Sequence, residues 1–314
     1  RVDCSKPMLP GTTVVYRCRP SYTEYPSLTT AGIYRRTLIC RQDGKWSGTL
    51  PECKPDCGIS TVVTPTIVDG RDTPLGEFPW HVGLYRQSED EKWKYICGGS
   101  LISNRIVLTA AHCVHDQKLR DLRVAMGKYY RSWYHHEKYA VVRNVSTIRT
   151  PLEYEGSATT YLWDIALLLL DKTIPVSRFV MPVCRDVTMQ YDITRNNTGY
   201  VVGWGTTKPD SNDSEILLSS QLTIFSNEVC RRKLIRIVAF DKFCGDKAQG
   251  YVAEKGDSGG GLTAVFNGLH YIFGIVSINY NNVSFFTNIS YQTNRLWIEE
   301  QIVALDQFAD LSSL

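Results

Sequence analysis

The chain has 314 residues, of which 43% are hydrophobic and 21% charged, and its formal net charge is +3. This length exceeds that of one small domain and suits a small module followed by a larger one. So small a net charge gives no reason to expect nucleic acid as a partner, and no stretch approaches the roughly 18 apolar residues of a membrane span. The chain starts with neither a signal peptide nor an initiator methionine, so we expect that upstream modules have been removed.

Ten cysteines, an even number without a Cys-x-x-Cys pair or zinc-type spacing, indicate disulfides and an oxidising compartment. Five Asn-x-Ser/Thr glycosylation acceptors agree with this, at Asn144, Asn196, Asn212, Asn282 and Asn288. We therefore expect a secreted, extracellular protein, and its partners have to be identified from its sites.

The first four cysteines enclose a segment with a proline-glycine turn, an alternating run at residues 13–16 that predicts a strand, and the turn sequence Asp-Gly-Lys before Trp46. Because these features follow one another in this order, residues 1–53 resemble a complement control protein (sushi) module. The resemblance implies the bridges Cys4–Cys40 and Cys18–Cys53. So short a segment buries little apolar surface, so the bridges and Trp46 have to supply much of its stability. A passive spacer and a docking module both remain open.

Residues 54–66 form a proline-containing linker and activation segment, and an all-β pattern follows over residues 67–302. Short apolar runs separated by Gly, Pro, Asn and Asp are typical of antiparallel strands. The expected strands include residues 82–85, 100–102, 106–108, 139–142, 165–170, 200–204 and 271–276. Residues 297–305 predict a helix with Ile298, Ile302 and Leu305 on one side, and residues 303–314 are assigned to a C-terminal tail.

Three fragments carry the residue types that hydrolyse an amide: a hydroxyl nucleophile, a base that takes its proton, and a carboxylate that orients the base. His112 lies in Thr-Ala-Ala-His-Cys, Asp164 in Asp-Ile-Ala-Leu-Leu, and Ser258 in Gly-Asp-Ser-Gly-Gly. Each fragment by itself could be structural. Their order, with Gly-Gly-Ser before the histidine and Val-Gly-Trp-Gly between the aspartate and the serine, favours the catalytic interpretation over the structural one.

From residue 67 to about residue 302 the sequence resembles the chymotrypsin family of serine proteases. The resemblance implies a chymotrypsin-like double β-barrel with a C-terminal helix, and neither a cofactor nor a metal. Ser258 would be the nucleophile, His112 the general base and then acid, and Asp164 the orienting carboxylate. The backbone N–H groups of Gly256 and Ser258 would form the oxyanion hole.

The sequence Ile67-Val-Asp-Gly resembles the amino terminus that cleavage creates in zymogens of this family. There the freed ammonium pairs with the aspartate before the nucleophile, here Asp257, and this pair orders the oxyanion hole and the pocket. Because the sequence runs unbroken through Thr66 and Ile67, we expect an uncleaved zymogen. The family resemblance also implies three bridges in this part of the chain: Cys57–Cys184, which keeps the leading segment attached, Cys97–Cys113 and Cys230–Cys244.

Five positions bear on the substrate pocket. Val252 stands where a trypsin-like enzyme keeps an aspartate, and a buried cation without that counter-charge is costly, so we expect a small or medium uncharged substrate residue. Asn279 and Ser284 stand where broad-pocket relatives carry glycine and would narrow the entrance, and Ser277 is assigned to the same pocket. Glu254 replaces a cysteine that ties the pocket walls together in most relatives, which leaves the pocket geometry open.

Further phrases of the sequence resemble the insect haemolymph modular serine proteases: residues 78–85, 127–131, 259–262 and 285–289. Complement proteases have the same order of modules, and horseshoe-crab clotting factors share several of these sequence segments. This resemblance implies a haemolymph-like fluid and an innate-immune cascade of the melanisation or Toll type. It implies a downstream protease zymogen as substrate, an upstream pattern-recognition protein that binds the sushi-like or missing modules, and a possible serpin inhibitor.

Self-cleavage is a further expectation, since Thr66 offers a trypsin-like activator no basic side chain and suits the uncharged pocket of this chain. Gly83 and Tyr95 stand where chymotrypsinogen carries the serine and histidine that lock its aspartate. The alternative is a separate, elastase-like activator. As a function for the whole chain, a catalytically impaired binding or regulatory protein on a protease fold remains the rival.

Two metal sites are disfavoured by the sequence. Adjacent His135 and His136 would point to opposite faces of a strand, and Lys128 stands where calcium-binding relatives carry glutamate.

Overall fold

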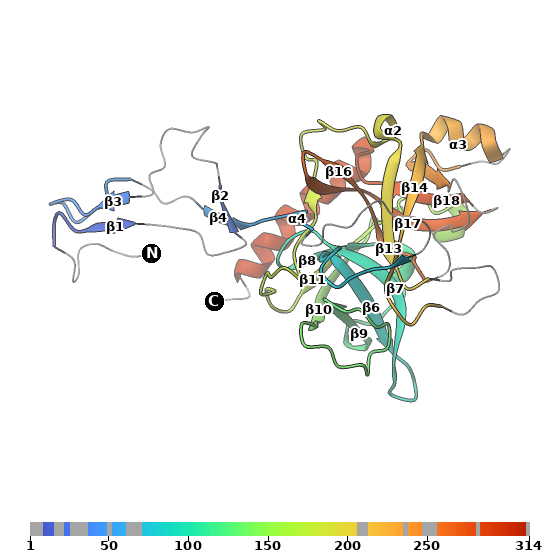
Figure 1. Cartoon of the computed structure of the whole chain (residues 1–314), viewed down its shortest axis with the longest axis horizontal. Coiled ribbons are helices and arrows are strands. Elements are labelled where there is room, and N and C mark those ends of the chain that lie inside the picture. Colours follow the sequence, from blue (N-terminus) through green and yellow to red (C-terminus); the bar gives the residue numbers. More distant parts are fainter. Residues whose placement is uncertain are drawn as a thin grey trace. The chain divides into compact units, whose positions relative to one another are not determined.

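The computed structural model describes residues 9–15, 22–25, 37–48, 52–60, 71–205, 213–234, 238–246, 256–280 and 283–311. The chain divides into two compact units, residues 1–56 and 57–314. Figure 1 shows short strands in the first unit and barrels in the second.

In the first unit β1 (Thr13–Val15) pairs with β3 (Thr37–Ile39), and β2 (Tyr22–Tyr25) pairs with β4 (Glu52–Pro55), both antiparallel. The strand expected at residues 13–16 is present as β1. A β-bridge joins Cys40 to Trp46, and the Cys40 side chain is buried. The two cystine pairs predicted for this unit involve Cys4 and Cys18, which lie outside the described residues, so these bridges stay predictions.

A closed barrel forms the first half of the second unit, with the strand order β10-β11-β8-β7-β6-β9. Its strands are β6 (His81–Gln87), β7 (Trp93–Leu101), β8 (Ile106–Thr109), β9 (Leu122–Met126), β10 (Val141–Arg149) and β11 (Ala166–Leu170). All five side chains of β11 are buried, which explains its unbroken apolar sequence. The strand expected at residues 139–142 begins only at Val141, because Tyr139 lies in the turn before it.

The second barrel closes because β17 pairs with both β16 and β18 at the two ends of one sheet. Its ring consists of β13 (Thr198–Gly203), β14 (Leu218–Phe225), β15 (Lys242–Asp246), β18 (Val283–Asn288), β17 (Leu269–Tyr280) and β16 (Gly261–Phe266). Two short strands extend it, β12 (Cys184–Arg185) on β17 and β5 (Arg71–Asp72) on β14. Closure leaves no free sheet edges, and the expected double β-barrel is confirmed.

One apolar cluster reaches from the first barrel into the second, which also has a cluster of its own. The shared cluster includes Val82 and Leu108 from the first barrel and Val202 and Ile275 from the second. The line where the barrels meet is therefore rigid, and the loops that reach it are held from both sides.

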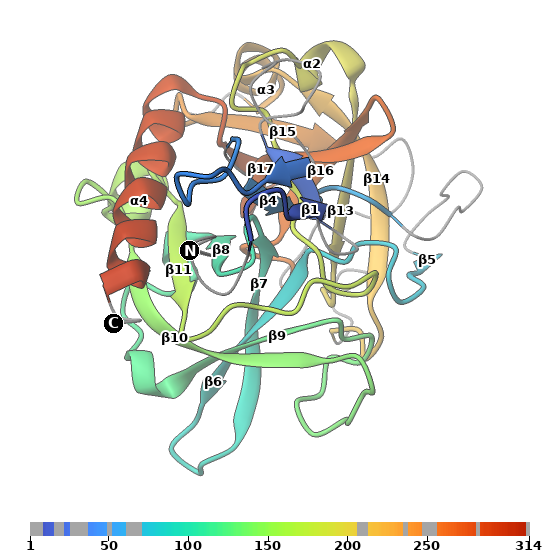
Figure 2. The ribbon, with the colours of Figure 1, turned by 90° about the vertical axis from the view of Figure 1, so that its left-hand side faces the viewer.

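Helices connect and cover the barrels (Figure 2). They are the 3-10 helices η1 (Ala111–Cys113), η2 (Leu119–Asp121) and η3 (Gly156–Thr159), and the α-helices α2 (Ile193–Asn196), α3 (Asn227–Leu234) and α4 (Gln292–Leu311). Helix α4 lies beside β11 and buries Ile298 and Leu305 in the core. It is longer than the helix expected at residues 297–305: it begins at Gln292, and residues assigned to a tail from the sequence continue it to Leu311. No helix among the described residues is long and apolar enough to cross a membrane.

Candidate active site

His112 and Asp164 meet where the two barrels join, although 52 residues separate them in the chain. His112 lies in η1, and Asp164 lies two residues before the start of β11. The Nδ1 atom of His112 is 2.8 Å from Asp164 Oδ2, and the backbone N–H of His112 donates to Asp164 Oδ1 at 2.9 Å. A carboxylate can only accept, so Nδ1 carries the ring proton and Nε2 is left with a lone pair for a nucleophile.

Asp164 is completely buried, and its remaining polar atoms are also bonded. Ser277 donates to Asp164 Oδ2 at 2.5 Å, and the hydroxyl of Thr287 donates to the Asp164 carbonyl at 2.9 Å. Burial by itself would raise the pKa of Asp164, but the hydrogen bond and charge of His112, the charge of Lys242 and the Ser277 hydroxyl hold that pKa below its ordinary value. The geometry supports an orienting role for Ser277, which the sequence analysis assigns to the pocket.

Ser258 lies in a tight turn bounded by Gly256, with φ of +104°, and Gly259, with φ of +79°. A Cβ on Gly259 would lie 2.3 Å from the hydroxyl oxygen of Thr109, so only glycine fits there. The N–H of Gly98 donates to the Ser258 carbonyl at 2.7 Å. These contacts hold the half-exposed Ser258 turn against β7.

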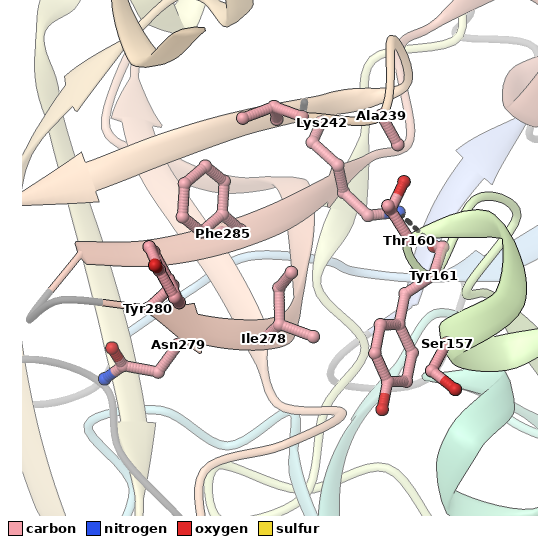
Figure 3. A pocket seen from close by; sticks show the side chains of 10 residues that line it. Ser157, Thr160, Tyr161, Ala239, Lys242, Ile278, Asn279, Tyr280 and Phe285 are labelled. Carbon is pink, nitrogen blue, oxygen red and sulfur yellow. Dashed lines mark hydrogen bonds between the residues drawn. The ribbon is translucent and has the colours of Figure 1, made fainter. Parts of the chain in front are cut away.

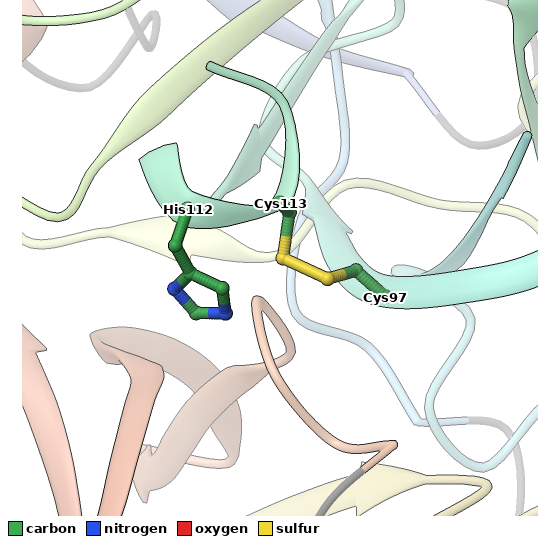
Figure 4. Close-up of side chains that lie close together, drawn as sticks. All are labelled: Cys97, His112 and Cys113. Atoms are coloured by element: carbon green, nitrogen blue, oxygen red, sulfur yellow. A yellow bond between two sulfur atoms is a disulfide. The ribbon is translucent and has the colours of Figure 1, made fainter. Parts of the chain in front are cut away.

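A disulfide ties the histidine to the strand that holds the Ser258 turn (Figure 4). Cys97 precedes Gly98 in β7, and Cys113 follows His112. In the described part of the chain, Cys97, His112 and Cys113 form the one group of potential metal ligands within 4.8 Å of one another. Their two sulfur atoms are bonded to each other, so they offer no thiolates to a metal.

Asp257 points into the interior next to the Trp204-Gly205 turn. Its Oδ1 atom accepts a 2.9 Å hydrogen bond from the N–H of Gly205. A Cβ on Gly203 or Gly205 would lie 2.2 Å or 2.4 Å from an Asp257 carboxylate oxygen, so both positions require glycine. Thr66 and Ile67 lie outside the described residues, so the activation pair with Asp257 stays a prediction.

The predicted pocket is described in part, since Val252 and Glu254 lie outside the described residues. Asn279 and Ser284 face each other across the β17–β18 pair; Ser284 is buried and Asn279 exposed. A cavity of about 340 Å³ opens next to them (Figure 3). Its lining includes Tyr161, whose ring centroid is 6.1 Å from that of His112.

The cavity is lined by the segment before Asp164 and by the second barrel: Ser157, Thr160, Tyr161, Val238, Ala239, Lys242, Ile278, Asn279, Tyr280 and Phe285. The sequence analysis assigned only Asn279 of these residues to the site. Lys242 and its neighbour Asp241 were missed, and the one signal for them is a charged pair between Phe240 and Phe243 in an apolar run.

The remaining candidates lie away from this cluster. Cys57 is bonded to Cys184, and Cys230 to Cys244. Of the five glycosylation acceptors, Asn144 is exposed and Asn288 half-buried, the Asn196 side chain is not described, and Asn212 and Asn282 lie outside the described residues.

The ammonium of Lys128 is buried in the turn that precedes β10. It donates to the carbonyl of His135 at 3.1 Å and to the Glu137 carboxylate at 2.9 Å. His135 and His136 lie in turns and not on the strand that the sequence analysis supposed. The Glu137 carboxylate is therefore already paired with a cation, the Lys128 ammonium.

Two family models match the chain: trypsin over residues 67–297 and the sushi repeat (SCR repeat) over residues 1–53. The chain therefore belongs to the trypsin family, a class of serine endopeptidases, as the resemblance to chymotrypsin indicated.

Three individual proteins are similar to this chain over most of its length. "Modular serine protease" of Drosophila melanogaster is 29% identical over 323 residues, covering 96% of this chain and 49% of the relative. "Clotting factor C" of Tachypleus tridentatus is 31% identical over 268 residues, 80% of this chain and 25% of its own length. "Phenoloxidase-activating factor 3" of Holotrichia diomphalia is 29% identical over 269 residues, which cover 78% of this chain and 75% of the relative. The chain thus spans about half the length of the first relative and a quarter of the second.

Proposed function

We propose that this chain is the sushi-linked catalytic part of a secreted serine endopeptidase zymogen. Cleavage at Thr66–Ile67 activates it, and the active enzyme then cleaves a downstream protease zymogen in an innate-immune cascade of the melanisation or Toll type. The observation that carries the proposal is the buried Asp164 that binds both His112 Nδ1 and the backbone N–H of His112. A protein that only binds partners has no need to bury a carboxylate behind a histidine in this way.

The cascade assignment rests on the relatives, among them a phenoloxidase-activating factor and a modular serine protease. In this proposal residues 1–53 form the sushi module, which binds an upstream pattern-recognition protein. Residues 54–66 are the activation segment, and the catalytic domain begins at residue 67. A serpin is the expected inhibitor, as for an extracellular protease that has to be switched off.

A reactive phosphonate tests the catalytic assignment. We expect a fluorophosphonate probe to label the chain strongly after cleavage before Ile67 and weakly before it, because the probe reacts with a serine that a histidine activates. Ser258→Ala should abolish labelling and turnover while leaving secretion intact. Absence of labelling in the cleaved, folded chain would favour the rival, a catalytically impaired regulatory protein.

We also propose that the zymogen is cleaved by its own active form. Thr66 suits a pocket floored by Val252 and narrowed by Asn279 and Ser284, which should prefer a small or medium uncharged residue. Purified Ser258→Ala zymogen, incubated with a trace of active wild type, should acquire a new amino terminus at Ile67. If this terminus does not form at concentrations where wild type converts itself, a separate elastase-like activator is required.

A further inference from the structure

Asp241 and Lys242 form a buried ion pair at the start of β15, next to the segment that precedes Asp164. The side chains of both residues are only 1% exposed, and the Lys242 ammonium lies 3.0 Å from Asp241 Oδ1 and 3.3 Å from Asp241 Oδ2. A buried ion pair costs desolvation free energy and is often replaceable by apolar residues without loss of stability. Its presence therefore calls for an explanation other than stability.

Both ions bond to the backbone just before Asp164. The Lys242 ammonium donates to the carbonyl of Tyr161 at 2.6 Å (Figure 3), and Asp241 Oδ2 accepts from the N–H of Trp163 at 3.0 Å. Lys242 also donates to the hydroxyl of Thr287, which in turn donates to the carbonyl of Asp164. The pair thus bonds to residues 161 and 163 directly and to residue 164 through Thr287.

The segment that these hydrogen bonds hold, residues 160–163, adopts an unfavourable backbone conformation. Thr160, Tyr161 and Trp163 have φ values of +54°, +58° and +62°, in the left-handed region that residues other than glycine rarely adopt. Consecutive strained residues persist only where surrounding contacts over-determine them, and they cluster at functional sites. The hydrogen bonds from Lys242 and to Asp241 are such contacts.

We infer that Asp241 and Lys242 are positioning residues of the protease: through the strained segment 160–164 they set the place of Asp164 behind His112 and of Tyr161 beside it. This inference rests on the proposed function, and it adds Asp241 and Lys242 to the residues that position the proposed active site. The charge of Lys242 also acts directly, since it is one of the contributions that keep the pKa of Asp164 low. In this inference both residues act on the reaction through Asp164 and Tyr161.

The test removes the pair without leaving one buried ion behind. In the cleaved full chain, the double variant Asp241→Asn/Lys242→Met should fold but lose kcat by about 10-fold to 100-fold, with KM for a short peptide substrate changed much less, because chemistry depends on the orientation of His112. Lys242→Gln, paired with Asp241→Asn, keeps a donor for the Tyr161 carbonyl and should recover part of kcat.

A matched control comes from a second buried ion pair, Lys128–Glu137, whose side chains are 4% and 10% exposed. Lys128→Met/Glu137→Gln removes similar charges from the turn before β10 and should leave kcat unchanged. The inference is overturned if the Asp241–Lys242 double variant keeps kcat within about twofold of wild type, or if the control loses as much kcat. Failure of the unsubstituted cleaved chain to turn over any substrate overturns the proposed function itself.

Discussion

Tyr95 lies beside the turn that carries Ser258, and its hydroxyl donates a 2.7 Å hydrogen bond to the carbonyl of Gly256. Burial, together with the nearby charge of Asp257, raises the pKa of Tyr95 far above its ordinary value, so the hydroxyl stays protonated and can donate at any physiological pH. In chymotrypsinogen the residue at this position helps to lock the aspartate. Here its hydroxyl bonds to the glycine proposed for the oxyanion hole.

Tyr95→Phe should therefore lower kcat about tenfold while leaving KM and stability nearly unchanged, because the ring still packs and only the anchor of Gly256 is lost. Steady-state kinetics on the cleaved chain measures this. Tyr85→Phe is the matched control, since the Tyr85 hydroxyl donates to the carbonyl of Arg131, outside the proposed oxyanion hole. Equal losses of kcat in the two variants would show that Tyr95 has no special role at Gly256.

At the scale of elements, the strands form the scaffold and the turns between them carry the chemistry. Asp164 lies two residues before β11, a strand whose side chains are all buried, so close packing of that strand holds the backbone that follows Asp164. The turn before β10 is organised differently, around the buried Lys128. The carboxylate of Glu137 there accepts both from that ammonium and from the N–H of Tyr129 at 2.6 Å.

Lys128→Met should destabilise the protein by about 3–5 kcal/mol, because it leaves the Glu137 charge buried without its cation. Adding Glu137→Gln removes the orphaned charge and should restore most of the loss. Urea unfolding of the two variants and the wild type measures the free energies. If the single variant is as stable as the double variant, the Lys128 ammonium does not neutralise Glu137 in the folded protein.

On the scale of the whole catalytic unit, burial lowers the pKa of two histidines. His81 is almost completely enclosed, packs against Trp204 with ring centroids 4.9 Å apart, and burial lowers its pKa to about 3. Burial likewise lowers the pKa of His270 to about 4. In the unfolded chain a histidine binds its proton near pH 6.5.

Stability should consequently fall as the pH drops below about 6.5, since the unfolded chain then binds protons that the folded protein refuses. Each histidine contributes about 1.4 kcal/mol per pH unit until the pH approaches its folded pKa. Unfolding free energies measured from pH 7 to pH 4.5 should show this slope, and His81→Leu should remove about half of it. A variant with the wild-type slope would mean that His81 is charged or exposed in the folded protein.

Many elements were predictable from short-range patterns. The apolar runs that became β6, β8, β11 and β13 are dense enough to indicate strands, and the turn residues between them mark their ends. Pairing was not predictable, because the register of β17 on both β16 and β18 depends on closure of the whole barrel. The first turn of α4 was missed for another reason, since its polar residues carry no apolar periodicity.

The sequence by itself predicted the roles that we propose for His112, Asp164 and Ser258, because each lies in a short fragment whose neighbours indicate its role. Only the tertiary structure decided what surrounds them. Lys242 reaches Tyr161 across 81 residues, Ser277 reaches Asp164 across 113, and Tyr95 reaches Gly256 across 161. No local pattern encodes such pairs, since barrel closure brings the partners together, and burial then makes each hydrogen bond strong enough to position a catalytic group.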